Sequence, residues 1–204
     1  MKNKDETKQR IFNAIGRLFK ADGINALYYA NIAREAGVDR SLVYQYFGRN
    51  IKKLIEDYIL QKDYWMKFFE KVKAEVGKND HEPGKELIIE LLQRQWEYLS
   101  ADMEMQHLIL WELTGDSDLM RSIHHTREMM AEPMLELAEQ KFKGTLVKIT
   151  PIIVLLLSGI YYANIHAVHN GSVICGIDVR SIEGQADLLK AIQQIIEWAY
   201  EHAA

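Results

Sequence analysis

Four polar side chains within residues 40–45 form the part of the sequence best suited to binding a partner. Arg40, Ser41, Tyr44 and Gln45 can share the outward side of one short helix, while Val43 falls on its apolar side. Guanidinium, hydroxyl and amide groups form hydrogen bonds with the edges of bases and with phosphate oxygens. The run therefore predicts a helix whose exposed face can bind a nucleic acid.

Two short helices and a turn must hold that face outward. Residues 30–36 and 40–47 each have the spacing of a short helix, and Ala33 provides the small side chain that a steep helix crossing needs. Gly37 tolerates a positive φ in the turn between them. Asp39 can cap the second helix by accepting its free backbone N–H groups. The segment therefore predicts a helix-turn-helix.

The segment over residues 32–47 also has a specific order of residue types. It reads Ile-Ala-Arg-Glu-Ala-Gly-Val-Asp-Arg-Ser-Leu-Val-Tyr-Gln-Tyr-Phe, and it follows a basic amphipathic helix over residues 5–20 and Gly23. This order resembles the DNA-binding domain of the TetR family, which commonly reads Ile-Ala, two variable residues, Ala-Gly-Val and then Tyr-x-Tyr-Phe. The resemblance covers residues 8–55. It implies that residues 40–47 lie in the major groove, and that a two-fold partner reads a second half-site about 34–36 Å away.

The resemblance implies contacts with double-stranded DNA that carries a palindromic operator. For base edges we expect Arg40, Ser41, Tyr44 and Gln45, with Leu42 against a thymine methyl. For phosphates we expect Tyr29, Tyr46, Asn50 and Lys52. Family members often have Thr in place of Leu42 and Lys in place of Asn50, so Arg49, Lys52 or Lys53 is expected to replace the lost lysine. The alternative is a helix-turn-helix that no longer binds DNA.

Composition and charge agree with a globular helical protein that has one basic end. The 204 residues are 48% hydrophobic and 26% charged, and only 3 prolines and 12 glycines interrupt the helical patterns. Residues 1–50 hold nine Lys and Arg against five Asp and Glu, whereas residues 51–204 hold 16 against 24. A basic end favours contact with a polyanion, although a chance fluctuation is the alternative. The single Cys175 and the absence of a signal-peptide pattern favour the cytoplasm.

The remaining patterns predict an all-α fold with about nine helices and no strands. The expected helices after the helix-turn-helix cover residues 50–76, 86–99, 103–113, 118–142, 150–166 and 181–202. Pro133 is expected to kink or split its helix, and Thr150 to cap the helix that has Pro151 in its first turn. We expect a three-helix DNA-binding domain over residues 1–50 and an effector-binding and dimerisation domain over residues 51–204.

The last two long helices are the expected dimer interface, because TetR-like proteins usually pair there as a four-helix bundle. The expected interface residues are Ile152, Leu156, Gly159, Ala163, Leu188, Ile192, Ile195 and Ala199. The alternative is that these helices bury each other within one chain. The uncharged stretch 149–170 is about as long as a membrane span, but polar residues interrupt it, which favours a buried interface helix and no membrane contact.

Aromatic and thioether side chains concentrate between these two regions. The resemblance implies an effector pocket there, for a small and mostly apolar molecule. The expected lining residues are Trp65, Phe69, Trp96, Met103, His107, Trp111 and Met129, and ordinary core packing is the alternative for each.

Other functional classes lack support in the sequence. No glycine-rich phosphate loop, nucleophile elbow or zinc-hydrolase motif occurs, so we expect neither an enzyme nor a cofactor. The seven histidines include the pairs His124–His125 and His166–His169, but no third metal ligand is evident, so we expect no metal. The sequence favours a homodimeric DNA-binding transcription regulator, a repressor released by its effector. The alternatives are a ligand-independent DNA-organising protein and a helical small-molecule-binding protein.

Overall fold

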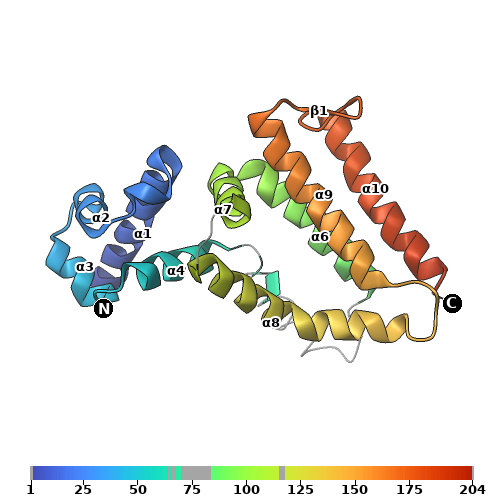
Figure 1. Cartoon of the computed structure of the whole chain (residues 1–204), viewed down its shortest axis with the longest axis horizontal. Helices are drawn as coiled ribbons and strands as arrows, with labels where there is room; N and C mark the ends of the chain where they lie inside the picture. The colour runs from blue at the N-terminus through green and yellow to red at the C-terminus, as the bar shows by residue number, and fades with distance from the viewer. Residues whose placement is uncertain (1, 64, 66–67, 70–83, 115–117, 204) are drawn as a thin grey trace. The chain divides into compact units, whose positions relative to one another are not determined.

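The structure, a computed structural model, describes residues 2–63, 65, 68–69, 84–114 and 118–203 (Figure 1). Nine α-helices, one short 3-10 helix and one two-stranded hairpin lie among these residues. The all-α prediction is therefore confirmed. The chain forms two compact units. The first unit comprises Met1–Asp63 and Met103–His124, and the second comprises Tyr64–Asp102 and His125–Ala204.

The first unit contains the helix-turn-helix. Its elements are α1 (Lys2–Asp22), the 3-10 helix η1 (Ile24–Ala26), α2 (Tyr29–Ala36), α3 (Arg40–Phe47), α4 (Ile51–Lys62), α7 (Met103–Thr114) and the start of α8 (Asp118–Lys141). α2 packs against both α1 and α3 (Figure 1). Their core is made of fully buried aliphatic side chains, among them Ile11, Ile15, Ile32 and Val43. The predicted three-helix arrangement is confirmed.

The turn between α2 and α3 depends on Gly37 and on a charged side chain from α1. Gly37 has φ 63° and ψ 40°, the left-handed conformation that ends a helix. The guanidinium of Arg10 donates to the carbonyl oxygens of Ala36, at 2.7 Å, and of Gly37, at 3.0 Å. The first contact supplies a donor at the C-terminus of α2, where helix carbonyls lack partners and carry partial negative charge. Arg10 therefore fixes α1 against the turn.

The N-terminus of α3 has the predicted cap. The Asp39 carboxylate accepts a hydrogen bond from the backbone N–H of Ser41 at 2.7 Å. Hydrogen bonding from the Ser41 side chain, followed by this backbone hydrogen bond and a smaller contribution from the charge of Arg40, holds the pKa of the Asp39 carboxyl below its usual range. The cap therefore defines the first turn of α3, from which the expected base contacts begin.

The predicted helix over residues 50–76 is wrong in its extent. α4 ends at Lys62, and the fully buried Asp63 has an extended ψ of 126°. Aspartate favours helix ends over helix interiors, because its short side chain competes for backbone hydrogen bonds. The apolar pattern continues through this position and gave no sign of the break. Most of residues 64–83 lie outside the described part of the chain.

The second unit is built around a layer of three long helices. Its elements are α6 (Lys85–Ala101), the rest of α8, α9 (Ile149–His169), the strands β1 (Val173–Ile174) and β2 (Ile177–Asp178), and α10 (Ile182–Glu201). α6 packs against both α9 and α10, which lie side by side in Figure 1. Fully or almost fully buried side chains from α6 and α10, such as Leu92, Leu99 and Ile196, form its core.

A small antiparallel hairpin replaces the loop predicted between α9 and α10. Val173 pairs with Asp178 and Ile174 with Ile177. Cys175 and Gly176 both have positive φ, 50° and 83°, as the tightest hairpin turns require. The prediction of no strands is therefore wrong at this point. Cysteine is not a residue that signals such a turn, so the sequence pattern was weak.

Two predicted details around prolines have different outcomes. Pro133 lies inside α8 without splitting it, so that part of the prediction is wrong, and a kink at Pro133 stays a prediction. α9 begins at Ile149 without a side-chain cap, so Thr150 does not act as the cap. Instead, the backbone N–H of Thr150 donates to a carboxylate oxygen of Glu139 at 3.1 Å, and hydrogen bonding from Thr150 lowers the pKa of the Glu139 carboxyl. A side chain from α8 thus satisfies the start of α9.

Helices α1, α4 and α7 meet at Gly16 within the first unit. A Cβ atom at position 16 would lie 2.8 Å from the Tyr58 hydroxyl and 2.8 Å from a carboxylate oxygen of Glu104. Glycine therefore permits the close approach of the three helices. Burial raises the pKa of the Glu104 carboxyl, against the opposing charge of Lys20. The ammonium of Lys62 lies 3.5 Å from the same carboxylate.

Substitution of Gly37 tests the turn. We expect Gly37→Ala to lower the free energy of unfolding by about 1 kcal/mol, because a Cβ is unfavourable at this φ, and its Cβ would lie 3.2 Å from the Arg10 guanidinium. Gly37→Asn should cost less, since asparagine tolerates the left-handed region. Urea denaturation measures both. Equal losses in the two variants would contradict the conformational explanation.

The buried carboxyl of Glu104 predicts a pH dependence of stability. Because its folded-state pKa lies above the ordinary value of 4.5, its contribution is full below pH 4.5 and is lost as the pH rises through the folded-state value. Glu104→Gln should therefore be more stable than the parent at pH 7, with the difference vanishing near pH 4. Urea midpoints at both pH values measure it. The matched variant Glu128→Gln, at an exposed position of α8, should show no gain. A loss of stability in Glu104→Gln at pH 7 would mean that the Lys62 ion pair outweighs burial.

Candidate DNA-binding interface

The outer face of α3 carries the side chains predicted to read bases. Arg40, Ser41 and Gln45 are exposed, Leu42 and Tyr44 are half-buried, and Val43 is completely buried. The single buried position anchors the helix to the core, because its side chain points away from the exposed ones. The five expected base contacts are thus all at least partly accessible on one short helix.

Tyr44 is the centre of an aromatic and cationic cluster. Its ring lies 4.6 Å from the ring of Tyr29, at an angle of 69°. The guanidinium carbons of Arg40 and Arg49 lie 5.7 Å and 5.4 Å from the Tyr44 centroid, within the range of cation–π attraction. Two positive charges therefore gather at one ring, one from α3 and one from the segment after it. Sequence reasoning considered Arg49 only as a substitute for a lost lysine.

Tyr29 has a defined place beside this cluster. Its hydroxyl donates to the carbonyl oxygen of Gly48 at 3.1 Å, which links the start of α2 to the end of α3. Burial raises the pKa of the Tyr29 hydroxyl, and Tyr44 adds to the rise. The phenol therefore stays neutral, and its oxygen can still accept a hydrogen bond but holds its own proton toward Gly48. A phosphate contact by Tyr29 remains a prediction.

Two lysines of α1 extend the positive charge along α3. The Lys4 ammonium lies 5.9 Å from the Tyr46 ring, and the Lys8 ammonium lies 5.9 Å from the Phe47 ring. Sequence reasoning did not include either lysine among the DNA contacts. The sequence did show that the first helix is basic. It did not show that Lys4 and Lys8 of this helix lie beside α3.

Three candidates for phosphate contacts lie at the start of α4, and the structure gives them different partners. The side-chain oxygen of Asn50 accepts a hydrogen bond from the backbone N–H of Lys53 at 3.2 Å, so Asn50 caps α4. The Lys53 ammonium lies 3.1 Å from carboxylate oxygens of both Glu56 and Asp57, which raise its pKa. Lys52 is exposed. Lys52 is therefore the better candidate for a phosphate contact.

The residues predicted to line an effector pocket fall in both units. In the first unit, the Phe19 ring lies 6.4 Å from the rings of His107 and of Trp111. In the second unit, Trp65 and Phe69 stack at 5.7 Å, and Trp96 is buried. Met103 and Met129 are exposed. The structure thus groups some of these side chains in pairs, and their part in ligand binding remains a prediction.

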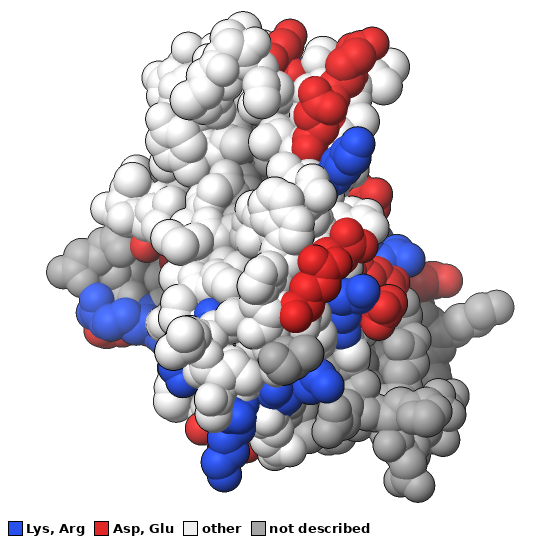
Figure 2. Space-filling model, turned by 90° about the vertical axis from the view of Figure 1, so that its right-hand side faces the viewer, with Lys and Arg blue, Asp and Glu red and all other residues white. Residues whose placement is uncertain are grey.

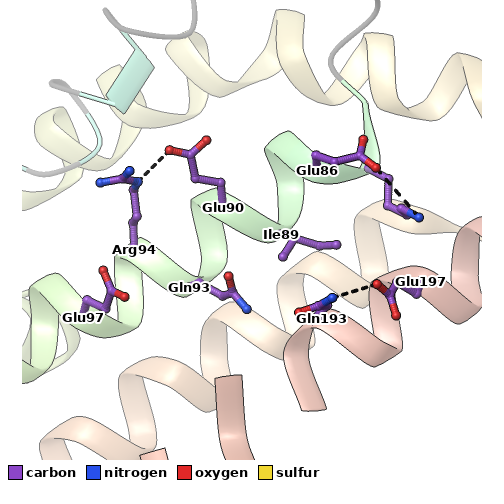
Figure 3. Close-up of a pocket in the computed structure, with 9 residues that line it drawn as sticks. Glu86, Ile89, Glu90, Gln93, Arg94, Glu97, Gln193 and Glu197 are labelled. Atoms are coloured by element: carbon purple, nitrogen blue, oxygen red, sulfur yellow. Dashed lines mark hydrogen bonds and ion pairs between the residues drawn. The ribbon is translucent and has the colours of Figure 1, made fainter. Parts of the chain in front are cut away.

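A groove of about 480 Å³ lies between α6 and α10 in the second unit (Figure 3). Its residues are Lys85, Glu86, Ile89, Glu90, Gln93, Arg94, Glu97, Gln193 and Glu197. Arg94 pairs with Glu90 at 2.6 Å, and Gln193 donates to Glu197 at 2.8 Å (Figure 3). None of the predicted lining residues belongs to it. The groove is charged and internally paired, so it does not suit a mostly apolar effector.

α9 carries an exposed apolar stripe. Leu155 is 73% exposed and Tyr162 is 61% exposed, and Gly159 lies between them on the same face. On the side of α10, uncharged atoms cover much of the visible surface (Figure 2). Of the predicted interface residues, Ile192 and Ala199 are each only 6% exposed. These two belong to the core of the chain, because their faces of α10 turn inward.

By length and composition, α9 is the one helix in the described part of the chain that could cross a membrane. Its inward face packs against α6 and α10, and Ile153, Ile160 and Ala167 are buried there. A partly packed helix of this kind also occurs in proteins that have no membrane span.

Comparisons with known proteins agree with this geometry. The family of bacterial regulatory proteins called tetR matches residues 11–58, which include α2, α3 and most of α4. No curated protein matches the chain. Among solved structures, the fatty acid degradation regulator FadR from Bacillus halodurans is 17% identical, covers 92% of this chain and 96% of its own, and has a TM-score of 0.66.

Two further solved structures cover nearly the whole chain. The transcriptional regulator FadR from Bacillus subtilis, solved with stearoyl-CoA, is 15% identical over 94% of this chain and 97% of its own, with a TM-score of 0.65. NalD, the secondary repressor of a multidrug efflux pump in Pseudomonas aeruginosa, is 18% identical over 97% and 96%, with a TM-score of 0.66. The chain therefore carries the DNA-binding domain of the tetR family of bacterial regulatory proteins over residues 11–58, and it has the fold of solved transcription regulators.

Proposed function

We propose that the chain is a homodimeric repressor that binds a palindromic operator and is released from it by a small, mostly apolar effector. The exposed polar face of α3 carries the DNA-binding part of this proposal. Arg40, Ser41 and Gln45 offer donors and acceptors of the kind that distinguish base pairs in the major groove. A cytoplasmic location belongs to the proposal, since the operator lies there. The proposal includes no catalytic step.

The charge around α3 supports binding to the DNA backbone. Arg40 and Arg49 lie beside Tyr44, while Lys4 and Lys8 lie beside Tyr46 and Phe47. Each basic group that meets a phosphate releases condensed counterions, which favours binding at low salt. The base-reading face therefore has positive charge at both of its ends.

Selection of bound sequences from a random DNA pool tests this function directly. The purified protein should enrich a palindromic consensus, with half-site centres about 10 base pairs apart or a multiple of that distance. Enrichment of no sequence, with binding that depends only on salt, would favour a DNA-organising protein and overturn the proposal.

Three single substitutions divide the expected DNA contacts. Arg40→Ala should weaken operator binding by about 1–3 kcal/mol and relax the preference at one base pair. Lys52→Ala should weaken binding to all sequences and reduce the slope of log affinity against log salt by about 1. Lys53→Ala, the matched control, should change little because Glu56 and Asp57 already hold that ammonium. Fluorescence anisotropy over a salt series measures all three. A larger effect of Lys53→Ala than of Lys52→Ala would contradict this assignment.

A second copy of the chain is the proposed partner of the α9 stripe. Leu155, Gly159 and Tyr162 expose an apolar strip along one helix face, and the half-buried Ile152, Leu156 and Ala163 border it. The same stripe on a two-fold related copy is complementary to it, as isologous interfaces require. A dimer also supplies the two recognition helices that a palindromic operator needs.

Charge placed on the stripe should separate the copies. Leu155→Glu would bury a carboxylate without a partner, so we expect it to shift the protein to monomers and to abolish tight operator binding. Leu146→Glu, at a fully exposed leucine outside α9, should leave the dimer intact. Sedimentation velocity measures the oligomeric state. Dimers of unchanged stability in Leu155→Glu would exclude this face as the interface.

The effector part of the proposal rests on the aromatic residues of the second unit. Trp65, Phe69 and Trp96 are buried there, whereas Met103 and Met129 are exposed and so suit a pocket less well. The FadR regulator solved with stearoyl-CoA shares the fold, which supports a ligand with a long apolar part. An effector releases the operator only if it binds the released state more tightly than the DNA-bound state.

A further inference from the structure

Gln95, on α6 in the second unit, has an incompletely paired amide in the protein interior. Its side chain is 0% exposed. Its amide nitrogen lies 3.5 Å from the hydroxyl oxygen of Tyr161 on α9, which is a long hydrogen bond. Its amide oxygen has no hydrogen-bond partner among the described residues. A primary amide can donate twice and accept twice, so most of its capacity is unused.

An aromatic cluster begins at the neighbouring hydroxyl. The Trp65 indole N–H donates to the Tyr161 hydroxyl at 2.8 Å. Trp65 also stacks on Phe69, and Phe69 meets Phe68 edge-on at 6.1 Å. All three rings are less than one tenth exposed. The amide and the hydroxyl thus form a small polar group beside an apolar, aromatic wall.

The unpaired oxygen of the Gln95 amide is an uncommon feature for a fully buried side chain. Nearly all buried polar groups in proteins have partners. The next residue, Trp96, adds a second exception, since its indole N–H is also buried and without a partner in the described chain.

We propose that the Gln95 amide, with the Tyr161 hydroxyl beside it, is the polar anchor of the effector site. The effector is a mostly apolar molecule whose one uncharged polar group both donates and accepts a hydrogen bond, such as a hydroxyl or an amide. Gln95, Tyr161 and Trp65 carry no charge, so they offer no counter-charge to a carboxylate or an ammonium. This inference rests on the proposed effector release, and it adds the chemical class of the ligand.

The anchor also gives the effector a preference between states. In the ligand-free chain, the Gln95 amide between α6 and α9 is paired among the described residues only through its nitrogen, with Tyr161. A ligand group that supplies the missing hydrogen bonds must fit between these two helices. It therefore binds a conformation with room for it more tightly than the ligand-free conformation described above.

The stability of the ligand-free protein gives the first test. Gln95→Met keeps the size of the side chain and removes the unpaired amide, so its melting temperature should equal or exceed that of the parent. Gln93→Met on the same helix is the matched control. It removes an amide that donates to the Leu189 carbonyl oxygen at 3.2 Å, so it should lower the melting temperature. If Gln95→Met lowers it as much as Gln93→Met does, the amide is a structural group and the proposal fails.

Binding of two probes gives the second test. In equilibrium dialysis with the full-length protein, 2-naphthol should bind at least tenfold more tightly than naphthalene, which lacks the hydroxyl. Gln95→Met should weaken 2-naphthol binding about tenfold and leave naphthalene binding within twofold. Equal binding of the two probes by the parent, or no effect of Gln95→Met, would overturn the proposal. If the parent protein selects no DNA sequence from the random pool, the proposed function is overturned, but the result of the probe-binding experiment remains valid.

Discussion

The guanidinium of Arg10 joins the first helix to the turn on which the DNA-binding head depends. It donates to two consecutive carbonyl oxygens at the end of α2. Those carbonyls have no helical partner of their own, and the end of α2 carries partial negative charge. The contact thus satisfies the backbone and orients α1 against the turn. Together with Gly37 and the buried Val43, this contact sets the direction of α3, and therefore of Arg40 and Gln45.

The helix-turn-helix could be predicted because local rules agree with one another there. Ala33, Gly37 and Asp39 each fill a position with a narrow physical requirement, and Val43 is the single buried position of α3. The break at Asp63 could not be predicted, because apolar spacing continues through it and tertiary burial of the aspartate decides the outcome. The hairpin at Cys175 was missed because its turn uses a residue that seldom has positive φ.

In the candidate sites, too, contacts between residues far apart in the sequence could not be predicted. The exposed side chains of α3 follow from helical periodicity alone. Lys4 and Lys8 come near the rings of Tyr46 and Phe47 only because α1 crosses α3, and sequence spacing does not encode a crossing. Gln95 and Tyr161 are 66 residues apart, so nothing in the sequence connects them. Apolar composition did identify Trp65 and Phe69, which stack in the second unit.

The chain passes between its two compact units three times, after Asp63, after Asp102 and after His124. The first two passages lie at helix ends, next to Lys62 and Ala101, where backbone torsions change at little cost. The third lies inside α8, which continues without interruption from Asp118 to Lys141. Pro133 has no N–H to donate to the carbonyl of Met129, so α8 has its lowest bending stiffness about two turns beyond the passage. Bending of α8 therefore costs least near Pro133, within the second unit.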